Sequence, residues 1–362
     1  MGSLFSSFAH MLPAKVLIDG LIFELQNRGG ISRVWSSLIS EFVRSERNFL
    51  YLENPILARK NIYRSHFEVA SDQLVSTTRN PRLAKYFYTK KRAEVEVPTY
   101  YKLMDPRCGS IQVCHDLMPE LTFGGFYGRA LRGGRRRLYS AAKTIVCVSK
   151  NTEAMLHQIY PETIGKTRVI YNPVDFRAID VALSSFGHAD VGIGDVLYVG
   201  NRDGFKNFWE IAELLRIFPS LRASVIGALP TSREISKVQE LGLTGRLNFL
   251  GPLGDSEMYA RLANAVFLFL PSVLEGFGMP IVEAMYLGCP VVCRDNSINR
   301  EISGDLACLY RPNDLSSMTS AVEAATSLKR DDRGIFVRKE YVQKYRAKDI
   351  ADQYWDVLTD EQ

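Results

Sequence analysis

The sequence predicts an α/β protein built from two doubly wound domains, in which helices cover parallel β-sheets. Short apolar runs recur along the chain, and each ends at a polar residue or a glycine. Runs without alternating polar residues are typical of strands buried on both faces of a parallel sheet. Apolar residues at spacings of three and four lie between many of these runs and indicate helices. This alternation of strand and helix, over a chain of 362 residues, favours two domains.

The predicted strands fall into two groups. In the first domain they cover residues 15–20, 110–115, 144–149 and 167–171. In the second domain they cover residues 195–200, 223–227, 247–251, 265–270 and 290–294. The segment 176–194 between the groups reads as a loop, so we place the first domain at residues 1–175 and the second at 190–340. A helix is predicted after the first strand from the spacing of Ile31, Val34, Trp35, Leu38, Ile39 and Phe42.

The composition is that of an ordinary globular protein, with 46% apolar and 23% charged residues. A net charge of +5 is too small to indicate a nucleic-acid partner. No apolar run approaches the roughly 20 residues of a membrane span, and no basic segment opens the chain, so we expect a cytoplasmic protein. The cysteines form no C-x-x-C pair and are expected to be free thiols; they are Cys108, Cys114, Cys147, Cys289, Cys293 and Cys308.

The segment from Glu275 to Glu283 carries the most informative chemistry. It follows a predicted strand, and Gly276 and Gly278 allow backbone N–H groups to approach a ligand closely. Pro280 suits the first turn of a helix, whose N-terminus adds a positive field for a phosphate or a sugar hydroxyl. A carboxylate such as Glu283 can accept two hydrogen bonds from a vicinal diol. The alternative is that Glu283 only complements the helix dipole and that Glu275 is a solvated loop charge.

This segment resembles the E-x7-E motif of retaining glycosyltransferases with the GT-B fold, especially glycosyltransferase family 4. The run Gly288-Cys-Pro-Val-Val resembles the continuation of that motif, and the resemblance covers nearly the whole chain. It implies two Rossmann-like domains that face each other across a deep cleft. The first would be the acceptor-side domain and the second the donor-binding domain, with the helix 341–362 packing back on the first.

The resemblance also implies roles for the residues of this segment. Glu275 would contact the hydroxyls of the donor sugar, and Glu283 would bind the ribose of the nucleotide. The backbone of Gly276, Phe277, Gly278, Met279 and Pro280 would contact the sugar and the diphosphate.

A second segment follows the strand 195–200 and contains Gly200, Asn201, Arg202 and Lys206. The resemblance implies that Arg202 and Lys206 bind the donor diphosphate and that Gly200 and Asn201 lie beside it. Fixed cations stabilise the negative charge that a departing nucleoside diphosphate carries. No D-x-D pair occurs in the sequence, so we expect neither a metal nor another cofactor. The alternative is a pair of solvated loop cations.

Two features of the first domain could face a donor. Gly29 and Gly30 precede a predicted helix and suit close approach to phosphate or sugar, although a tight structural turn is the alternative. His115 ends a predicted strand and begins an H-D-x-x-P pattern, which the resemblance places beside the donor sugar and acceptor. A histidine there could orient the sugar or take the acceptor proton, whereas Asp116 could be a helix cap. The predicted catalytic residues are therefore His115, Glu275, Lys206 and Arg202.

The basic run from Arg129 to Arg137 predicts peripheral contact with an anionic membrane at its inner face; the alternative is a solvated helix face. Taken together, the sequence predicts transfer of a hexosyl unit, of mannose or glucose type, from a GDP or UDP sugar to an acceptor sugar hydroxyl. The resemblance implies retention and an acceptor in polysaccharide, lipopolysaccharide or glycolipid synthesis. Two other functions stay open, namely another GT-B enzyme such as a sugar-nucleotide epimerase and a non-catalytic subunit that binds nucleotide sugar.

Overall fold

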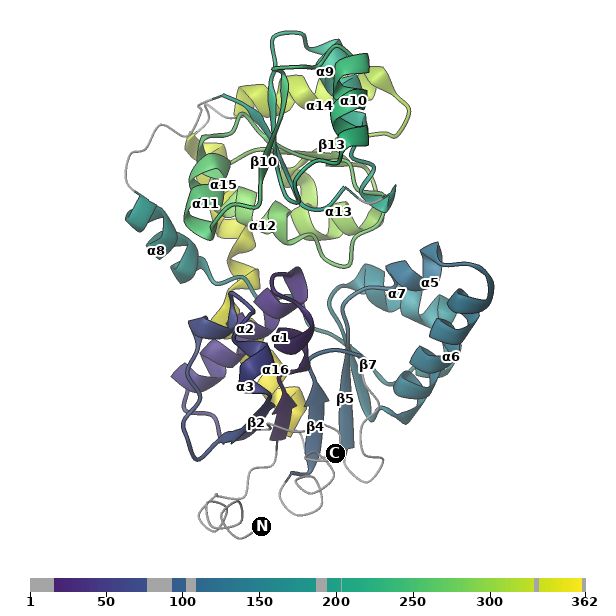
Figure 1. The fold of residues 1–362 in the computed structure, drawn as a ribbon, viewed down its shortest axis with the longest axis vertical. Coiled ribbons are helices and arrows are strands. Elements are labelled where there is room, and N and C mark those ends of the chain that lie inside the picture. The colour runs from purple at the N-terminus through teal and green to yellow at the C-terminus, as the bar shows by residue number, and fades with distance from the viewer. Residues whose placement is uncertain are drawn as a thin grey trace. The chain divides into compact units, whose positions relative to one another are not determined.

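The computed structural model describes residues 16–76, 93–101, 109–186, 194–202, 204–328 and 332–359. The contacts within the chain divide it into two compact units (Figure 1). The N-terminal unit comprises residues 1–173 together with residues 347–362. The C-terminal unit comprises residues 174–346. Each unit is built around one parallel sheet flanked by helices.

The sheet of the N-terminal unit has seven parallel strands in the order β3-β2-β1-β4-β5-β6-β7. They are β1 (Val16–Asp19), β2 (Phe49–Glu53), β3 (Leu74–Ser76), β4 (Val95–Pro98), β5 (Gly109–Cys114), β6 (Thr144–Cys147) and β7 (Thr167–Val169). The four strands predicted in this half are confirmed. Strands β2, β3 and β4 were not predicted from the sequence. The buried carboxylates Glu53 in β2 and Glu96 in β4 explain part of this, because they interrupt the apolar pattern of an interior strand.

The helices of the N-terminal unit include the one predicted after the first strand. They are α1 (Leu21–Leu25), α2 (Gly30–Arg44), α3 (Pro55–Ala58), α5 (Met118–Thr122), α6 (Gly125–Ala141), α7 (Lys150–Ile159) and α16 (Ala347–Thr359). Although α16 closes the described chain, it packs on α2. The rings of Trp35 and Tyr354 lie 6.3 Å apart, and those of Phe42 and Trp355 lie 5.2 Å apart. These aromatic contacts attach the last helix to the N-terminal unit.

The sheet of the C-terminal unit has six parallel strands in the order β10-β9-β8-β11-β12-β13. They are β8 (Val196–Val199), β9 (Ala223–Ile226), β10 (Leu247–Gly251), β11 (Leu268–Leu270), β12 (Val291–Arg294) and β13 (Cys308–Tyr310). The order of the strands reverses between β8 and β11. In open α/β sheets a ligand binds beyond the carboxyl ends of the strands at such a switch point. We therefore expect a ligand site at the loops after β8 and β11.

The helices of this unit are α8 (Phe176–Phe186), α9 (Glu210–Ile217), α10 (Ser232–Glu240), α11 (Asp255–Asn264), α12 (Met279–Tyr286), α13 (Ser297–Ser303), α14 (Leu315–Leu328) and α15 (Asp332–Tyr341). The prediction of a loop over 176–194 is wrong for α8. The Asp175 side chain accepts a hydrogen bond from the Ala178 N–H at the start of this helix. Phe176 stacks on Tyr286, with the ring centroids 4.1 Å apart. An N-terminal cap and one buried face make this segment a helix of the C-terminal unit.

The described cysteines are free, and Cys114, Cys147, Cys289 and Cys293 are buried. Burial raises the pKa of the Cys293 thiol, which therefore stays protonated and packs as a small apolar group. Cys308 is partly exposed, and Cys108 lies outside the described residues. Within the described part of the chain, no helix combines the length and the apolar character needed to cross a membrane.

Candidate functional site

The loops that follow β8 and β11 are joined to each other at the switch point of the C-terminal sheet. The N–H of Val273 donates to the carbonyl oxygen of Phe205 over 2.8 Å. Beside this backbone bond, the ammonium of Lys206 donates to Oε1 of Glu275 over 2.7 Å. Two residues that are far apart in the sequence and that were both predicted as catalytic are thus in direct contact.

The Lys206–Glu275 pair is mostly shielded from water but still accessible. The side chains are 20% and 9% exposed, respectively. An ammonium has three N–H donors, so Lys206 can bind an anionic oxygen while it holds Glu275. Glu275 has further lone pairs that can accept from hydroxyl groups. The pair can therefore present one cation and one acceptor to a ligand that carries both phosphate and hydroxyls.

The loop after β11 leads directly into α12, and its backbone requires glycine at one position. Gly278 precedes α12 with φ of +93°, a left-handed conformation that disfavours residues with a side chain. Pro280 lies in the first turn, where it lacks an N–H that would need a partner. This geometry directs the loop into the N-terminus of α12, where the first turn of a helix favours an anion. The Phe277 side chain is buried against Tyr345, with the rings 5.2 Å apart, so only its backbone can contact a ligand.

Glu283 lies within α12 and is only 1% exposed. Its position on the helix that begins at the loop is the one predicted from the motif. A carboxylate so far removed from water is costly unless polar groups surround it. A carboxylate that only complements the helix dipole could stay at the surface. The burial of Glu283 therefore favours a role in binding a ligand.

Arg202 is turned toward α10 rather than toward Lys206. Its Nε and Nη2 donate to the two carboxylate oxygens of Glu234 over 2.5 and 3.1 Å. Its Nη1 donates to the Ala228 carbonyl over 2.8 Å, and Nη2 donates to the Leu229 carbonyl over 3.0 Å. The hydrogen bonds from Arg202 lower the pKa of Glu234 to about 2. Arg202 therefore ties the loop after β8 to the loop after β9.

Sequence reasoning missed Glu234, although a signal was present. Thr231 and Glu234 form a capping box at the start of α10, in which each side chain bonds the backbone N–H of the other. The spacing T-x-x-E before a helix is readable from sequence. The contact between this cap and Arg202 cannot be predicted from the sequence, because it depends on how the two loops fold together.

Three neighbouring strands of this sheet are followed or closed by glycines at their carboxyl ends. The N–H of Gly200 donates to the Ile226 carbonyl over 2.9 Å, and that of Gly227 donates to the Gly251 carbonyl over 3.1 Å. A Cβ added at Gly227 would lie 2.3 Å from the Gly200 carbonyl oxygen, so only glycine fits there. Asn201, next along the loop, accepts a hydrogen bond at its carbonyl from the Tyr198 hydroxyl. At this edge the backbones of β8, β9 and β10 are therefore bonded to one another, and the absence of a side chain on Gly227 allows their close approach.

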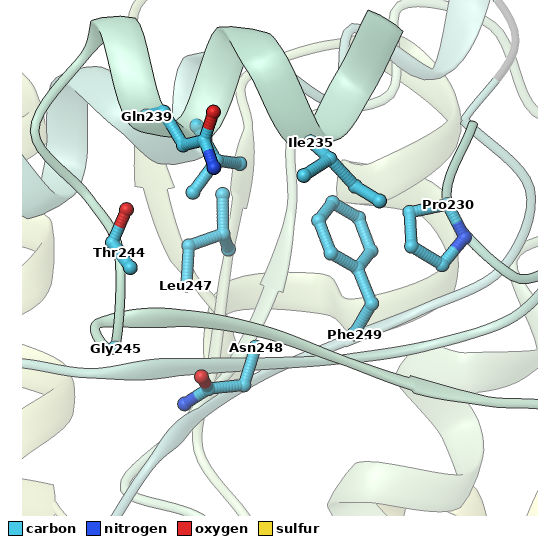
Figure 2. Close-up of a pocket in the computed structure, with 9 residues that line it drawn as sticks. Pro230, Ile235, Gln239, Thr244, Gly245, Leu247, Asn248 and Phe249 are labelled. Atoms are coloured by element: carbon cyan, nitrogen blue, oxygen red, sulfur yellow. The ribbon is translucent and has the colours of Figure 1, made fainter. Parts of the chain in front are cut away.

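A separate pocket of about 320 Å³ lies between α10 and the edge strand β10 (Figure 2). Ile235, Leu247 and Phe249 supply apolar walls, and Gln239 and Asn248 supply amides. None of the site residues predicted from sequence lines this pocket. It is therefore distinct from the Lys206–Glu275 pair.

In the N-terminal unit, His115 directly follows β5 and is 7% exposed. Among the described residues, neither ring nitrogen of His115 has a hydrogen-bond partner. Burial, assisted by the positive charge of Arg135, lowers the pKa of His115 to about 3. The imidazole is consequently neutral near pH 7, with one nitrogen available to donate and the other available to accept.

Gly29 is the N-cap residue of α2 and Gly30 begins this helix, so both lie at a helix start as the sequence predicts. No side chain of the described residues caps this helix end, and a Cβ added at Gly30 would meet nothing within 4 Å. Gly29 is extended, and an added Cβ would meet only the tip of the Gln26 side chain. The helix end therefore leaves room for an anion beside its N–H groups.

The basic run from Arg129 to Arg137 lies on α6, and one of its members does not face solvent. Arg135 is 6% exposed, and its Nη1 donates to both carboxylate oxygens of Glu120 over 2.9 Å. The prediction that the whole run contacts a membrane is therefore wrong for Arg135. The exposed members of the run are Arg129, Arg132, Arg136 and Arg137.

Comparison with known proteins adds to this geometry. A family described as glycosyl transferases group 1 matches residues 194–344, and one described as glycosyltransferase family 4 matches residues 97–177. The chain is 29% identical over 136 residues to O-antigen chain mannosyltransferase B of Escherichia coli, covering 36% of each chain. It is 26% identical over 184 residues to O-antigen chain mannosyltransferase RfbU of Salmonella typhimurium, covering 50% of each. The matches thus span about a third to a half of the length of these curated relatives.

A solved structure resembles nearly the whole chain. The crystal structure of HepE from Anabaena in complex with UDP and glucose matches with a TM-score of 0.71 at 17% identity, covering 96% of this chain and 100% of that one. At this identity the likeness shows the fold, and the predicted GT-B fold class is confirmed.

Proposed function

We propose that the chain is a family 4 glycosyltransferase that transfers a hexosyl unit from a nucleoside diphosphate sugar to an acceptor sugar hydroxyl. The observation that carries the proposal is the contact between Lys206 and Glu275 at the switch point of the C-terminal sheet. The pair offers a cation for the diphosphate and an acceptor for the sugar hydroxyls. The relatives named as mannosyltransferases favour a mannosyl donor, and the solved structure that holds UDP and glucose favours a UDP sugar.

The transfer requires stabilisation of the departing diphosphate. As the bond between the anomeric carbon and the phosphate oxygen breaks, negative charge grows on the diphosphate, and Lys206 with the N-terminus of α12 stabilises it. Glu275 accepts hydrogen bonds from the donor sugar, and Glu283 accepts them from the ribose diol. Lys206 and the N-terminus of α12 supply the positive field for the diphosphate without a metal ion. Arg202 is assigned to the same loop, where its bonds to Glu234 hold the backbone in place.

The new bond forms between the acceptor oxygen and the anomeric carbon on the face that the diphosphate leaves. This front-side path gives retention, and the acceptor proton moves to the departing phosphate oxygen. We assign to neutral His115 a hydrogen bond with a sugar hydroxyl, since its pKa makes it a poor cation near pH 7. Gly29 and Gly30 are assigned to a further anionic or hydroxyl group at the start of α2.

The test is a transfer assay with a panel of GDP and UDP sugars, alkyl glycosides as acceptors and EDTA in the buffer. The proposal predicts release of one nucleoside diphosphate and a product whose anomeric configuration, measured by NMR, equals that of the donor. An inverted product would overturn the mechanism. Binding of a nucleotide without turnover of any donor would instead favour a non-catalytic subunit.

The acceptor is proposed to be lipid-linked, because α5 and the start of α6 expose a group of large apolar side chains. Leu121, Phe123, Phe126 and Tyr127 are 49%, 47%, 81% and 63% exposed. Aromatic rings prefer the interface between water and lipid, and arginines are attracted to anionic headgroups. We therefore retain the proposal of peripheral membrane contact, through this apolar group together with the exposed arginines of α6.

Vesicle flotation tests this contact with anionic and zwitterionic lipid. We expect binding to anionic vesicles only, and we expect Phe126→Ser with Tyr127→Ser to abolish it. The matched control is Phe336→Ser, which removes a ring that is 65% exposed in the C-terminal unit. Equal binding to neutral vesicles, or no binding to either, would contradict the proposal.

A further inference from the structure

We propose that Tyr101 and Arg135 are positioning residues that brace the turn carrying His115. The inference rests on the proposed function in that His115 takes part in transfer, but it concerns residues that neither the motif nor the comparisons assign. The brace consists of Tyr101, Arg135, Glu120 and Tyr160, all in the N-terminal unit.

Tyr101 holds the turn through its hydroxyl group. The hydroxyl oxygen accepts hydrogen bonds from the N–H of His115 over 3.2 Å and from the N–H of Asp116 over 3.4 Å. The same hydroxyl donates to the Asp116 carbonyl over 3.1 Å. One side-chain atom therefore contacts both backbone N–H groups immediately beyond β5, which fixes the direction in which the chain leaves the sheet.

Arg135 supports this arrangement from α6. Its guanidinium carbon lies 3.6 Å from the centre of the Tyr101 ring, a close cation–π contact. Its Nη1 also donates to the Asp116 carbonyl over 3.1 Å. Arg135 thereby contacts both the ring that holds the turn and the turn itself.

Glu120 fixes the guanidinium in this position. Its carboxylate accepts from Arg135, and Oε1 also accepts from the Tyr160 hydroxyl over 3.2 Å. The side chains of Arg135 and Glu120 are 7% and 0% exposed. A buried ion pair adds little net stability over apolar residues of similar size, because both charges lose their hydration. The ion pair instead fixes geometry, because Glu120 holds the Arg135 guanidinium against the Tyr101 ring.

Several charged and titratable groups lie around the turn, and of these Arg135 acts with burial to lower the pKa of His115. These groups are Arg135 on α6, Glu120 on α5, Asp116 in the turn and Tyr101 after β4. The Asp116 side chain is directed to the start of α5, where it accepts from the Met118 N–H over 3.2 Å. The brace thus keeps a neutral imidazole in a fixed orientation at the end of β5.

The decisive variant is Tyr101→Phe, which keeps the ring beneath Arg135 and removes only the hydroxyl. We expect kcat to fall roughly 10-fold to 100-fold, with KM for the donor nearly unchanged. In a His115→Ala background, Tyr101→Phe should have no further effect, because the brace acts through His115. The matched control is Tyr310→Phe, which removes another buried hydroxyl, one that donates to Glu210. An unchanged kcat, or the same loss in both backgrounds, would overturn the brace.

A second readout requires no turnover and separates this inference from the proposed function. The ring resonances of His115 in 1H–15N NMR spectra should shift or broaden in Tyr101→Phe and stay unchanged in Tyr310→Phe. The His115 resonances should change less in Arg135→Lys than in Arg135→Gln. Lysine keeps the positive charge, although it lacks the planar guanidinium. Unchanged His115 resonances in Tyr101→Phe would overturn the brace even in a protein without transferase activity.

Discussion

The ammonium of Lys206 donates to the carboxylate of Glu275 over 2.7 Å, across 69 positions of sequence. The contact joins the two loops that leave the sheet on either side of its switch point. A nucleotide sugar could bind this pair with both of its parts, the phosphate at Lys206 and the sugar hydroxyls at Glu275. The pair is therefore the centre of the proposed donor site.

Replacement of Lys206 tests the charge of that site. Lys206→Ala should lower kcat/KM by roughly 100-fold to 1000-fold, because one preorganised stabiliser of the leaving group is lost. Steady-state kinetics with the preferred donor measures the effect. The control is Lys348→Ala, since Lys348 lies on α16 in the N-terminal unit, where its half-exposed side chain pairs with Asp352. Near-normal turnover in Lys206→Ala would remove this residue from the mechanism.

Replacement of Glu283 tests the binding of the ribose. Glu283→Gln should weaken nucleotide binding about tenfold, because the amide keeps only one of the two acceptor oxygens that a diol can bond. The wild type should also prefer a ribonucleotide to the corresponding 2′-deoxynucleotide, and the variant should lose that preference. Calorimetric titration of both nucleotides into both proteins measures this. An identical preference in wild type and variant would show that Glu283 does not contact the diol.

Disruption of the Arg202–Glu234 pair tests whether Arg202 acts through its loop. Glu234→Gln leaves Arg202 in place but weakens its hold, so nucleotide affinity should fall in this variant as it does in Arg202→Lys. If Arg202 binds the diphosphate directly, Glu234→Gln should instead leave affinity equal or higher, since it frees the guanidinium. Nucleotide affinities of the two variants distinguish these outcomes.

The neutral state of His115 predicts a pH dependence of stability. Its pKa is about 3 in the folded protein, against an ordinary value of 6.5, so the unfolded chain binds a proton that the folded chain does not. This contribution to the unfolding free energy is fully present above pH 6.5 and decreases as the pH falls toward 3. The slope is about 1.4 kcal/mol per pH unit for one proton.

Denaturant unfolding of wild type and His115→Gln between pH 7 and pH 4.5 isolates this contribution. The difference in stability between the two proteins should shift in favour of the variant as the pH falls. A difference that stays constant over this range would mean that His115 is protonated in the folded state as readily as in the unfolded chain.

The sequence allowed prediction of the features that local pattern encodes. The loop from Glu275 to Glu283 and the histidine after β5 lie where the strand pattern and the motif put them. The strands β8 to β12 were readable because their apolar runs are continuous. The partners of buried arginines were not readable, because Arg135 and its exposed neighbour Arg136 look alike in sequence. Only the packing of α6 on Glu120 and Tyr101 distinguishes them.

The same reason explains the misread helix α8 and the partner of Arg202. In the segment from Phe176 to Phe186, only Phe176 and Ile179 are buried and Val181 is 67% exposed, so its apolar residues do not form the long buried stripe that marks a helix. Its helical state depends on contacts such as that of Phe176 with Tyr286, which lies 110 positions later. Glu234 could be recognised as a helix cap from its spacing to Thr231, but its second contact depends on the packing of β8 beside β9.

The proposed donor site is tested most directly by thermal unfolding with GDP, UDP, ADP, dTDP and their sugars, without metal and with EDTA. A ligand that binds only the folded state raises the melting temperature by mass action. The proposed donor site predicts that one nucleotide raises the melting temperature of the wild type, that EDTA leaves this shift intact, and that Lys206→Ala loses it. Absence of a shift with every nucleotide, or a shift that EDTA abolishes, would contradict it.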